Sequence, residues 1–273
     1  MRFGRRLAAA VGAYGPLCVG IDPHSGLLAD WGLPDDASGV ERFGRTLVDS
    51  LADEVALIKP QSAFFERHGS RGVAALEAVL ADACAAGLLV LLDVKRGDIG
   101  STMGGYAEAY LSDGSPLAAD AITVSPYLGF GSLEPALELA SRTGRGVFVL
   151  ARTSNPEGAS VQEARAGDRS VAQTVVDEVS ARNIGADPLG DVGVVVGATG
   201  EYHLDLAALN GPVLAPGLGA QGATPTDIAA RFTGVSGTVL PTASRSVLRH
   251  GPGAASLRAA VRELRDELAN AAG

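Results

Sequence analysis

Three charged residues follow a run of apolar residues near the middle of the sequence. The stretch from Leu88 to Thr102 reads LLVLLDVKRGDIGST, and Asp93, Lys95 and Asp98 come directly after its apolar part. A short apolar run of this kind is typical of a buried parallel strand. Because residues two apart in a strand point to the same face, we expect Asp93 and Lys95 to project together, with Val94 on the opposite face. Asp98 would lie just past the strand end, within reach of the same ammonium group or of a second subunit.

The cost of burying such a cluster leaves two interpretations open. Taking an ion out of water costs several kcal/mol unless an opposite charge compensates it. One interpretation is chemical, with a buried acid and base held side by side for work on a ligand. The other is structural, since buried ion-pair networks also occur without chemistry.

Length and composition limit the fold and the partners. The 273 residues allow either two small domains or one α/β barrel, which typically needs about 250 residues. A hydrophobic fraction of 47% and a charged fraction of 19% describe a globular protein with a sizeable core. The formal net charge of -9 gives no electrostatic reason to bind nucleic acid or an anionic membrane, so an anionic ligand would need positive groups placed locally.

Cysteine and histidine patterns indicate neither a disulfide framework nor a metal site. Cys18 and Cys84 lie in apolar contexts without CxxC spacing, so we expect buried, reduced thiols. The four histidines are scattered without the spacing of zinc ligands. The arginine-flanked N-terminal segment faintly resembles a secretory signal, but Gly15 and Pro16 interrupt it, and no run of about 18 apolar residues follows anywhere. We therefore expect a cytoplasmic protein with no metal.

The order of strand and helix patterns predicts the fold class. Candidate strands alternate with helical patterns along the whole chain, without a break in composition. The candidate strands are Leu17–Asp22, Val55–Lys59, the run that begins at Leu88, Ala121–Ser125, Gly146–Ala151, Val192–Val196, Pro212–Ala215 and Thr238–Leu240. Strict alternation of this kind predicts one (β/α)₈ TIM barrel, forming a single domain over residues 1–273.

Local signals predict several helix boundaries. Ser38 and Glu41 have the spacing of a capping box at the start of one helix. The run from Thr224 to Asp227 reads TPTD, the pattern of an N-cap, a proline in the first turn and an acid. A further helix is expected over about Asp168 to Asn183, before the sixth strand.

The connection after Ala151 is longer than a barrel requires. It is polar and contains Arg152 and Asn155, to which no motif assigns a role. Long connections of this kind are often active-site lids, so we expect a lid here.

In a (β/α)₈ barrel, the groups that act on a ligand come from the C-terminal ends of the strands and from the loops that follow them. The candidate groups at these ends are Asp22, Lys59, Asp93 with Lys95, Ser125, Arg152, Gly197, the GLGAQG loop and Arg245. Strands one to three alone would bring two acids and two lysines to one rim.

These strand-end motifs resemble a known family. The run DVKRGDIGST is similar to the Asp-x-Lys-x-x-Asp-Ile signature of the orotidine 5′-phosphate decarboxylases. The other motifs agree in family order: GIDPH at Asp22, IKPQ at Lys59, TVSPY at Ser125, APGLGAQG near Gln221 and SRSVL at Arg245. The resemblance covers strands one to eight and looks closest to the longer bacterial subgroup.

The resemblance implies decarboxylation of orotidine 5′-monophosphate to uridine 5′-monophosphate and CO2 without a cofactor, the last step of uridine monophosphate synthesis. The alternating charge array of the family maps onto Lys59, Asp93, Lys95 and Asp98. Loss of CO2 leaves a carbanion, whose developing charge a fixed ammonium stabilises. Lys95 would supply that ammonium and then its proton, while the neighbouring carboxylates keep it charged.

The resemblance also implies the binding residues and the assembly. Asp22 and Thr102 would bind ribose hydroxyls, and Ser125 would bind the amide edge of the pyrimidine. Gln221 and Arg245 would hold the phosphate, at a place where barrels often bind phosphate and where paired arginine donors suit it. In the family the second aspartate enters from the partner subunit. This implies a homodimer in which Asp98 and Thr102 complete the partner's site.

Plainer alternatives exist for several of these residues. Asp22 could cap a turn, Ser125 could be a turn residue before Pro126, and Arg245 could be a solvated surface charge. The chain also departs from the family pattern at one position. Many members have glycine directly before the phosphate-binding arginine, whereas this chain has Ser244.

Three other functions compete with the decarboxylase. Gly217 to Gly222 matches the GxGxxG pattern of dinucleotide sites, but it lies in the seventh unit and lacks the acid expected about 20 residues later. The same glycines suit a phosphate loop equally well. Sugar-phosphate decarboxylases and aldolase-like synthases of the same superfamily use the Asp-x-Lys strand with magnesium, but lack the pyrimidine-reading serine. A barrel that binds nucleotide without turnover would gain nothing obvious from two buried lysines between carboxylates.

Overall fold

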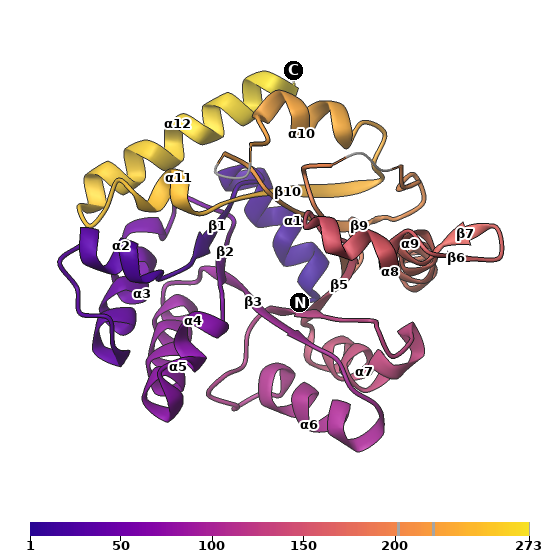
Figure 1. The fold of residues 1–273 in the computed structure, drawn as a ribbon, viewed down its shortest axis with the longest axis horizontal. Coiled ribbons are helices and arrows are strands. Elements are labelled where there is room, and N and C mark those ends of the chain that lie inside the picture. Colours follow the sequence, from indigo (N-terminus) through magenta and orange to yellow (C-terminus); the bar gives the residue numbers. More distant parts are fainter. Residues whose placement is uncertain (201–202, 220–221, 273) are drawn as a thin grey trace.

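Within the residues that the computed structural model describes, 1–200, 203–219 and 222–272, eight parallel strands close into a central barrel (Figure 1). Around the barrel the strand order is β1, β10, β9, β8, β5, β4, β3 and β2. Barrel strands that are consecutive in the sequence are therefore hydrogen-bonded neighbours, and β10 closes the barrel against β1. Their bounds are β1 (Cys18–Ile21), β2 (Leu57–Pro60), β3 (Leu89–Arg96), β4 (Ala121–Val124), β5 (Gly146–Arg152), β8 (Val192–Val196), β9 (Gly211–Pro216) and β10 (Gly237–Ala243). The predicted (β/α)₈ barrel is thereby confirmed.

The predicted strands agree with the observed ones to within a few residues. β8 has the predicted bounds, while β9 and β10 extend further than expected. β3 runs on through Arg96, so Asp93 and Lys95 belong to the strand itself. Val94 packs into the core between strands and helices, which confirms the predicted alternation of faces.

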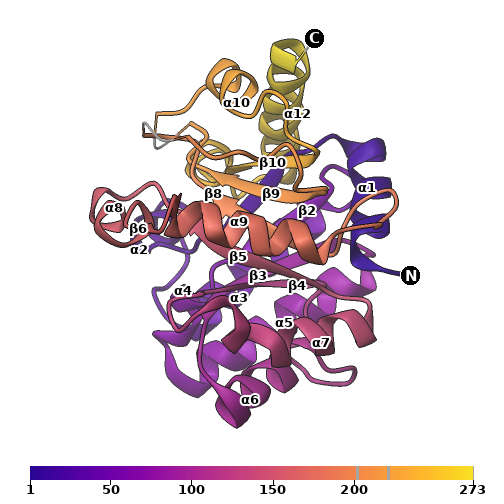
Figure 2. The ribbon, with the colours of Figure 1, turned by 90° about the vertical axis from the view of Figure 1, so that its right-hand side faces the viewer.

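Helices cover the outside of the barrel (Figures 1 and 2). The longer ones after the strands are α3 (Ala37–Leu51), α5 (Gly69–Ala85), α6 (Gly100–Leu111), α7 (Glu134–Thr143), α9 (Val171–Arg182), α10 (Pro225–Arg231) and α12 (Ala254–Ala272). Shorter elements in the connections are α2 (Ser25–Asp30), α4 (Ala63–Glu66), α8 (Ala159–Gln162), α11 (Arg245–Leu248), the 3₁₀ turns η1 (Phe130–Leu133) and η2 (Pro156–Gly158), and the hairpin of β6 (Arg165–Ala166) and β7 (Arg169–Ser170). The apolar face of α3 is fully buried through Val40, Phe43 and Leu47, as helical spacing predicts.

Two helix starts differ from their predictions and one agrees. The Ser38–Glu41 capping box is wrong, because Asp36 caps α3 instead, accepting hydrogen bonds from the amides of Ser38 (2.9 Å) and Gly39 (3.0 Å). Asp36 lies nearer the helix start, and its carboxylate is as good a cap as a serine hydroxyl. The predicted helix from Asp168 begins at Val171, since the residues before it form the β6–β7 hairpin. The predicted cap of α10 is confirmed as a full capping box at Thr224.

The two cysteines are both free thiols, but they differ in exposure. Cys18 is buried in β1, as expected. Cys84 is exposed, so the prediction of a buried thiol is wrong there. It lies near the end of α5, where the apolar neighbours in sequence belong to the buried face and Cys84 does not.

An N-terminal helix, α1 (Phe3–Tyr14), closes one end of the barrel and was not predicted. Figure 2 shows it on the side of the barrel opposite α8 and the β6–β7 hairpin. Phe3 and Leu7 are fully buried among inward-facing strand residues, and the Phe3 ring meets Phe148 of β5 edge to face, with 6.0 Å between centroids. The alanine-rich segment taken as a faint signal sequence is therefore the plug at the N-terminal ends of the strands.

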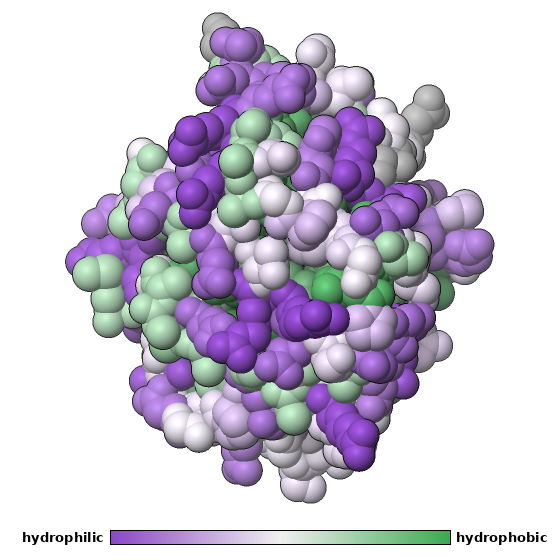
Figure 3. All heavy atoms as spheres, turned by 90° about the vertical axis from the view of Figure 1, so that its left-hand side faces the viewer, coloured by the Kyte–Doolittle hydropathy of each residue, from purple (hydrophilic) through white to green (hydrophobic). Residues whose placement is uncertain are grey.

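One face of the outer surface is largely polar. On the face at the left of Figure 1, hydrophilic side chains cover most of the surface, and apolar ones form scattered patches (Figure 3). In the part of the chain that the structure describes, no helix is both long and apolar enough to cross a membrane.

Truncating the buried side chain of α1 should lower the stability of the protein without changing residues at the C-terminal end of the barrel. We expect Phe3→Ala to reduce the free energy of unfolding by about 3–5 kcal/mol, because it empties a fully buried aromatic site. Urea titration followed by circular dichroism measures this. The exposed neighbour Arg5 provides the control, since Arg5→Ala should change stability by about 0.5 kcal/mol or less. Equal effects of the two substitutions would show that α1 is not part of the core.

Candidate active site

A buried carboxylate bridges two lysines at the C-terminal end of the barrel. Asp93 of β3 accepts from the Lys59 ammonium at 2.9 Å through Oδ2 and from the Lys95 ammonium at 2.6 Å through Oδ1. Lys59 lies near the end of the adjacent strand β2, and the Lys59 and Asp93 side chains are each 7% exposed. Lys95 is 44% exposed, so its ammonium faces the open end of the barrel. The predicted cluster of Lys59, Asp93 and Lys95 is therefore present in one chain.

Thr123 of β4 completes the bonding of the shared carboxylate and was missed in the sequence. Its hydroxyl donates to Asp93 Oδ1 at 2.8 Å and accepts from the backbone amide of Lys95 at 2.9 Å. It points inward because it lies two residues before Ser125 on the same strand face. The two-residue spacing from Ser125 could have predicted that Thr123 faces the site. Threonine is common in strands, however, so its presence alone did not indicate a functional role.

The charges at this end of the barrel set one another's protonation. Burial alone would raise the pKa of the Asp93 carboxyl, but the charges of Lys59 and Lys95 outweigh it and hold that pKa well below its usual value. Burial alone would lower the pKa of Lys59, but Asp93 and Asp22 outweigh it and raise that pKa. Burial raises the pKa of the nearby Cys18 thiol to about 12, so the thiol stays neutral. Asp93 and Lys59 therefore remain charged at neutral pH.

The backbone at Lys95 is unusual for a residue with a side chain. Its φ is +45°, in the left-handed region, and the pairing of β3 with β4 shifts register between Leu92 and Arg96. A non-glycine residue in this region costs about 1–3 kcal/mol and persists only where its surroundings hold it. Such strain is concentrated at functional sites. The distortion turns the Lys95 side chain relative to a regular strand.

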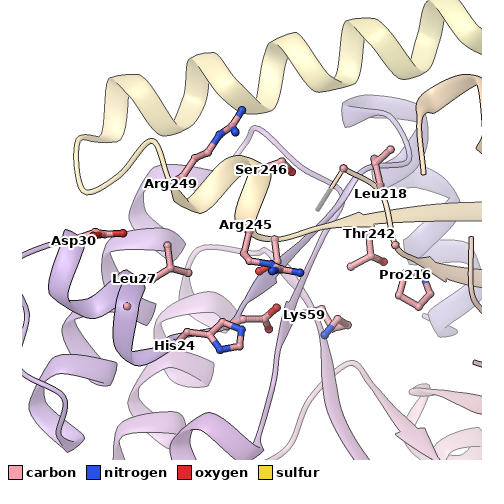
Figure 4. Close-up of a pocket in the computed structure, with 15 residues that line it drawn as sticks. His24, Leu27, Asp30, Lys59, Pro216, Leu218, Thr242, Arg245, Ser246 and Arg249 are labelled. Atoms are coloured by element: carbon pink, nitrogen blue, oxygen red, sulfur yellow. The ribbon is translucent and has the colours of Figure 1, made fainter. Parts of the chain in front are cut away.

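A pocket of about 1000 Å³ opens beside the ion pairs. Its lining includes Asp22 and His24 after β1, Lys59 of β2, the glycine loop after β9, and Ser244 to Ser246 after β10. Figure 4 shows the Arg245 side chain ending between His24 and Lys59 in this view, while the guanidinium of Arg249 points away. Asp22, Lys59 and Arg245, which lie at or just after the C-terminal ends of β1, β2 and β10, therefore line one cavity.

Several polar atoms of this pocket are buried without a hydrogen-bond partner among the described residues. They are Asp22 Oδ1, Ser244 Oγ and Ser246 Oγ. Unpaired buried polar atoms are costly, so a cavity lined with them is suited to a ligand that supplies the missing partners.

Ser244 occupies its place because Gly20 leaves room for it. A Cβ atom on Gly20 of β1 would lie 3.0 Å from Ser244 Cβ and 3.2 Å from Asp22 Oδ2. This is tighter than ordinary packing, so the hollow above Gly20 holds the serine side chain. The departure from the family pattern at Ser244 is thus accommodated by a glycine on the adjacent strand.

The other end of the pocket has the features of an anion site. The loop after β9 turns through Gly217 (φ +125°) and Gly219 (φ +75°), which brings its backbone close to the cavity. Arg245 begins α11 beside this loop, where a Cβ atom on Gly219 would lie 3.2 Å from the Ser246 side chain. Backbone amides and a guanidinium together suit phosphate. The predicted phosphate residue Gln221 lies outside the described residues.

Three of the predicted residues are not joined to the cluster within one chain. Asp98 accepts a hydrogen bond from the Ile99 amide at 2.8 Å, and no ion pair among the described residues joins it to Lys95. Thr102 is exposed on the first turn of α6. Ser125 is half-buried at the end of β4, and its amide donates to the carbonyl of Arg96 at 2.7 Å.

The long connection after β5 is folded against the barrel by Arg152. The buried guanidinium donates to Glu163 at 2.7 Å and to Gln162 at 3.2 Å, which ties α8 to the strand end. Asn155 bonds within the same segment, accepting from the Thr153 hydroxyl at 2.6 Å. Arg152 and Asn155 therefore organise this connection, and closure of the connection as a lid stays a prediction.

Comparison with known proteins identifies the family. Residues 15–260 match the family described as "Orotidine 5'-phosphate decarboxylase / HUMPS family". The chain belongs to this family. It is 64% identical over 260 residues to the orotidine 5′-phosphate decarboxylase of Salinispora arenicola, covering 94% of each chain. A crystal structure from Streptomyces avermitilis is 57% identical, with a TM-score of 0.95 over 99% of this chain and 96% of that one. The structure of Leishmania donovani OMP decarboxylase is 32% identical, with a TM-score of 0.77 over 100% and 99% of the two chains.

Membership of the orotidine 5′-phosphate decarboxylase / HUMPS family agrees with the motifs from which the resemblance was inferred. The matched range begins before β1 and ends within α12, so it contains every strand of the barrel. Among the described residues, no group of three histidine, cysteine, aspartate or glutamate side chains is placed to hold a metal ion.

The shared carboxylate should contribute strongly to stability at neutral pH. We expect Asp93→Asn to lower the free energy of unfolding at pH 7 by about 3–5 kcal/mol, because it leaves Lys59 buried without its counter-charge. The folded-state pKa of Asp93 is depressed, so its contribution is present above about pH 4 and is lost as the pH falls through the folded-state value. The difference between wild type and variant should therefore shrink toward pH 3.

Urea unfolding at pH 7 and pH 3 measures this difference. The exposed pair of Asp113 with Arg145 is the control, and Asp113→Asn should cost about 1 kcal/mol or less. A loss for Asp93→Asn that is equally large at both pH values would contradict the electrostatic explanation.

Proposed function

We propose that the protein decarboxylates orotidine 5′-monophosphate to uridine 5′-monophosphate and CO2, without a cofactor, as the final step of pyrimidine nucleotide synthesis. The observation that carries the proposal is the Lys59–Asp93–Lys95 array beside a pocket that ends in Arg245. Family membership and the decarboxylase relatives support it.

The array can stabilise the charge that develops in this reaction. The bond between the pyrimidine ring and its carboxylate breaks, CO2 leaves, and the electron pair stays on the ring carbon. The Lys95 ammonium, fixed by Asp93 at 2.6 Å, faces the open end of the barrel, where it stabilises that pair and then donates its proton to the carbon. A preorganised charge of this kind needs no reorganisation during the reaction.

Asp93 and Lys59 play supporting roles in this proposal. Asp93 orients the Lys95 ammonium through their 2.6 Å contact, and it would crowd the departing carboxylate. Lys59 neutralises Asp93 and reaches toward the ribose, since it lines the pocket together with Asp22. Because all three charges come from adjacent strands of a rigid barrel, their distances change little when a ligand binds.

Binding is proposed to run along the pocket from the ion pairs to Arg245. Asp22 would accept from a ribose hydroxyl through its unpaired oxygen, and Ser125 would bind the amide edge of the pyrimidine. Arg245 and the amides of the glycine loop would hold the phosphate, with Gln221 as an expected further contact. We also propose a cytoplasmic homodimer, in which Asp98 and Thr102 complete the partner's site.

The competing functions differ in what they require. A nucleotide-binding barrel would bind uridine monophosphate without consuming the orotidine nucleotide. A magnesium-dependent sugar-phosphate decarboxylase would lose activity with a chelator. One assay separates both from the proposal.

We expect purified protein to consume orotidine monophosphate, followed by its absorbance, at a rate that excess EDTA does not change. Lys95→Ala should lower kcat by about 10⁴-fold or more, because it removes both the stabilising charge and the proton donor. Arg245→Ala is the contrasting variant, since it should raise KM by about 100-fold with a smaller effect on kcat. Unchanged turnover in Lys95→Ala would remove the central assignment, and loss of activity with EDTA would favour the magnesium enzymes.

Hybrid dimers test whether Asp98 acts across the subunit interface. We expect Lys95→Ala and Asp98→Ala homodimers to be nearly inactive. When the two are co-expressed with different tags and mixed at equal amounts, one of the two sites in each hybrid regains Lys95 from one subunit and Asp98 from the other. Activity of the mixture should return to about a quarter of wild type, as a twofold-symmetric dimer requires. No recovery would place Asp98 outside the partner's site.

A further inference from the structure

Arg96 lies on the outer face of β3, directly after Lys95, and bonds to two helices. Its guanidinium pairs with Glu66 at the end of α4 and donates to the Tyr110 hydroxyl of α6 at 3.0 Å. It also lies 5.6 Å from the centre of the Tyr106 ring and 5.7 Å from that of Tyr110. One arginine therefore joins the catalytic strand to α4 on one side and to α6 on the other.

Glu66 continues this connection to the other end of the catalytic segment. The Ser62 hydroxyl donates to Glu66 Oε1 at 2.5 Å, and the Ser62 amide donates to the backbone carbonyl of Asp93 at 3.3 Å. The short path from Arg96 through Glu66 and Ser62 thus returns to Asp93. Lys95 therefore lies between Asp93, which Ser62 holds, and Arg96, which Glu66 holds.

Lys95 requires such support because its backbone is strained. With φ at +45°, it relaxes to a regular strand unless both flanks are fixed. Its own amide is held by Thr123 at 2.9 Å, and the carbonyl of Arg96 accepts from the Ser125 amide at 2.7 Å. These are neutral hydrogen bonds, whereas the Arg96–Glu66 pair is a charged one and is half-buried.

We infer that Arg96 is a positioning residue, which uses its contacts with Glu66, Tyr106 and Tyr110 to hold Lys95 in the left-handed conformation that directs its ammonium into the site. The inference rests on the proposed decarboxylation, because that function gives the orientation of Lys95 its importance. Arg96 itself does not touch the ligand pocket, since its side chain lies between β3 and the helices.

The planar guanidinium suits this role better than lysine does. It pairs with a carboxylate, donates to a hydroxyl and stacks on aromatic rings at the same time. Lysine could keep the ion pair with Glu66, but it lacks the planar set of donors that contacts Glu66 and Tyr110 at the same time. The inference therefore predicts a graded loss from Arg96 to lysine and then to an uncharged residue of similar length.

The first experiment is steady-state kinetics of Arg96→Lys and Arg96→Met on orotidine monophosphate. We expect Arg96→Met to lower kcat by about 100-fold, because a small misplacement of a reacting group costs this much, while KM changes by about threefold or less. Arg96→Lys should lie between wild type and Arg96→Met. Tyr110→Phe, which deletes one hydrogen bond from the clamp, should lower kcat by about fivefold.

Arg45 offers a matched control in the helix layer. It pairs with Glu41 at 3.1 Å and with Asp82 at 2.7 Å, joining α3 to α5 without touching β3. Arg45→Met should leave kcat unchanged. Thermal unfolding of every variant shows whether it is folded at the assay temperature. If Arg96→Met does not fold, Arg96→Lys and Tyr110→Phe carry the test.

Hybrid dimers separate positioning of Lys95 from a general structural effect. In the hybrid with one working site, Arg96→Met is placed either in the subunit that supplies Lys95 or in the one that supplies Asp98. We expect the loss of kcat mainly in the first arrangement. Equal losses in both, or a rise in KM with unchanged kcat, would overturn the inference. Wild-type protein that fails to decarboxylate would instead overturn the proposed function, and the inference with it.

Discussion

The Asp93 carboxylate shared by Lys59 and Lys95 is the interaction on which the rest of this site depends. Each of its oxygens accepts from one ammonium, at 2.9 Å and 2.6 Å, and Thr123 adds a third donor. A buried ion is tolerable only when paired and hydrogen-bonded, so the buried Asp93 and Lys59 require each other, and the more exposed Lys95 adds a second ion pair. The barrel supplies the condition for this arrangement, because the parallel strands β2, β3 and β4 end side by side.

Beyond that cluster, the proposed function assigns binding and reaction to different residues around one pocket. Lys59 of the charged array lines this pocket together with Arg245 and the glycine loop. Asp22 lines it too, and its buried Oδ1 has no partner among the described residues. In the proposed function, binding energy from the phosphate contacts is used to hold the pyrimidine against Lys95, as remote contacts do in many enzymes.

Much of this arrangement could be predicted from the sequence, because strict alternation of strands and helices leaves few architectures. A barrel then places all strand ends on one rim, which is why Lys59, Asp93 and Lys95 were expected together. The left-handed backbone at Lys95 could not be predicted, since nothing in a lysine signals it. The role of α1 was missed because an alanine-rich helix flanked by arginines looks like a targeting segment. Asp98 and Thr102 could be assigned only by resemblance, because their expected partners lie on another chain.

The contact between Gly20 and Ser244 has a consequence for how the sequence can change. The two positions share one small volume, since a Cβ on Gly20 would lie 3.0 Å from Ser244 Cβ. A methyl group at position 20 therefore requires the Ser244 side chain or the Asp22 carboxylate to shift by a few tenths of an ångström. The two positions are in contact although 224 positions separate them in the sequence, so the effects of substitutions at the two should not add.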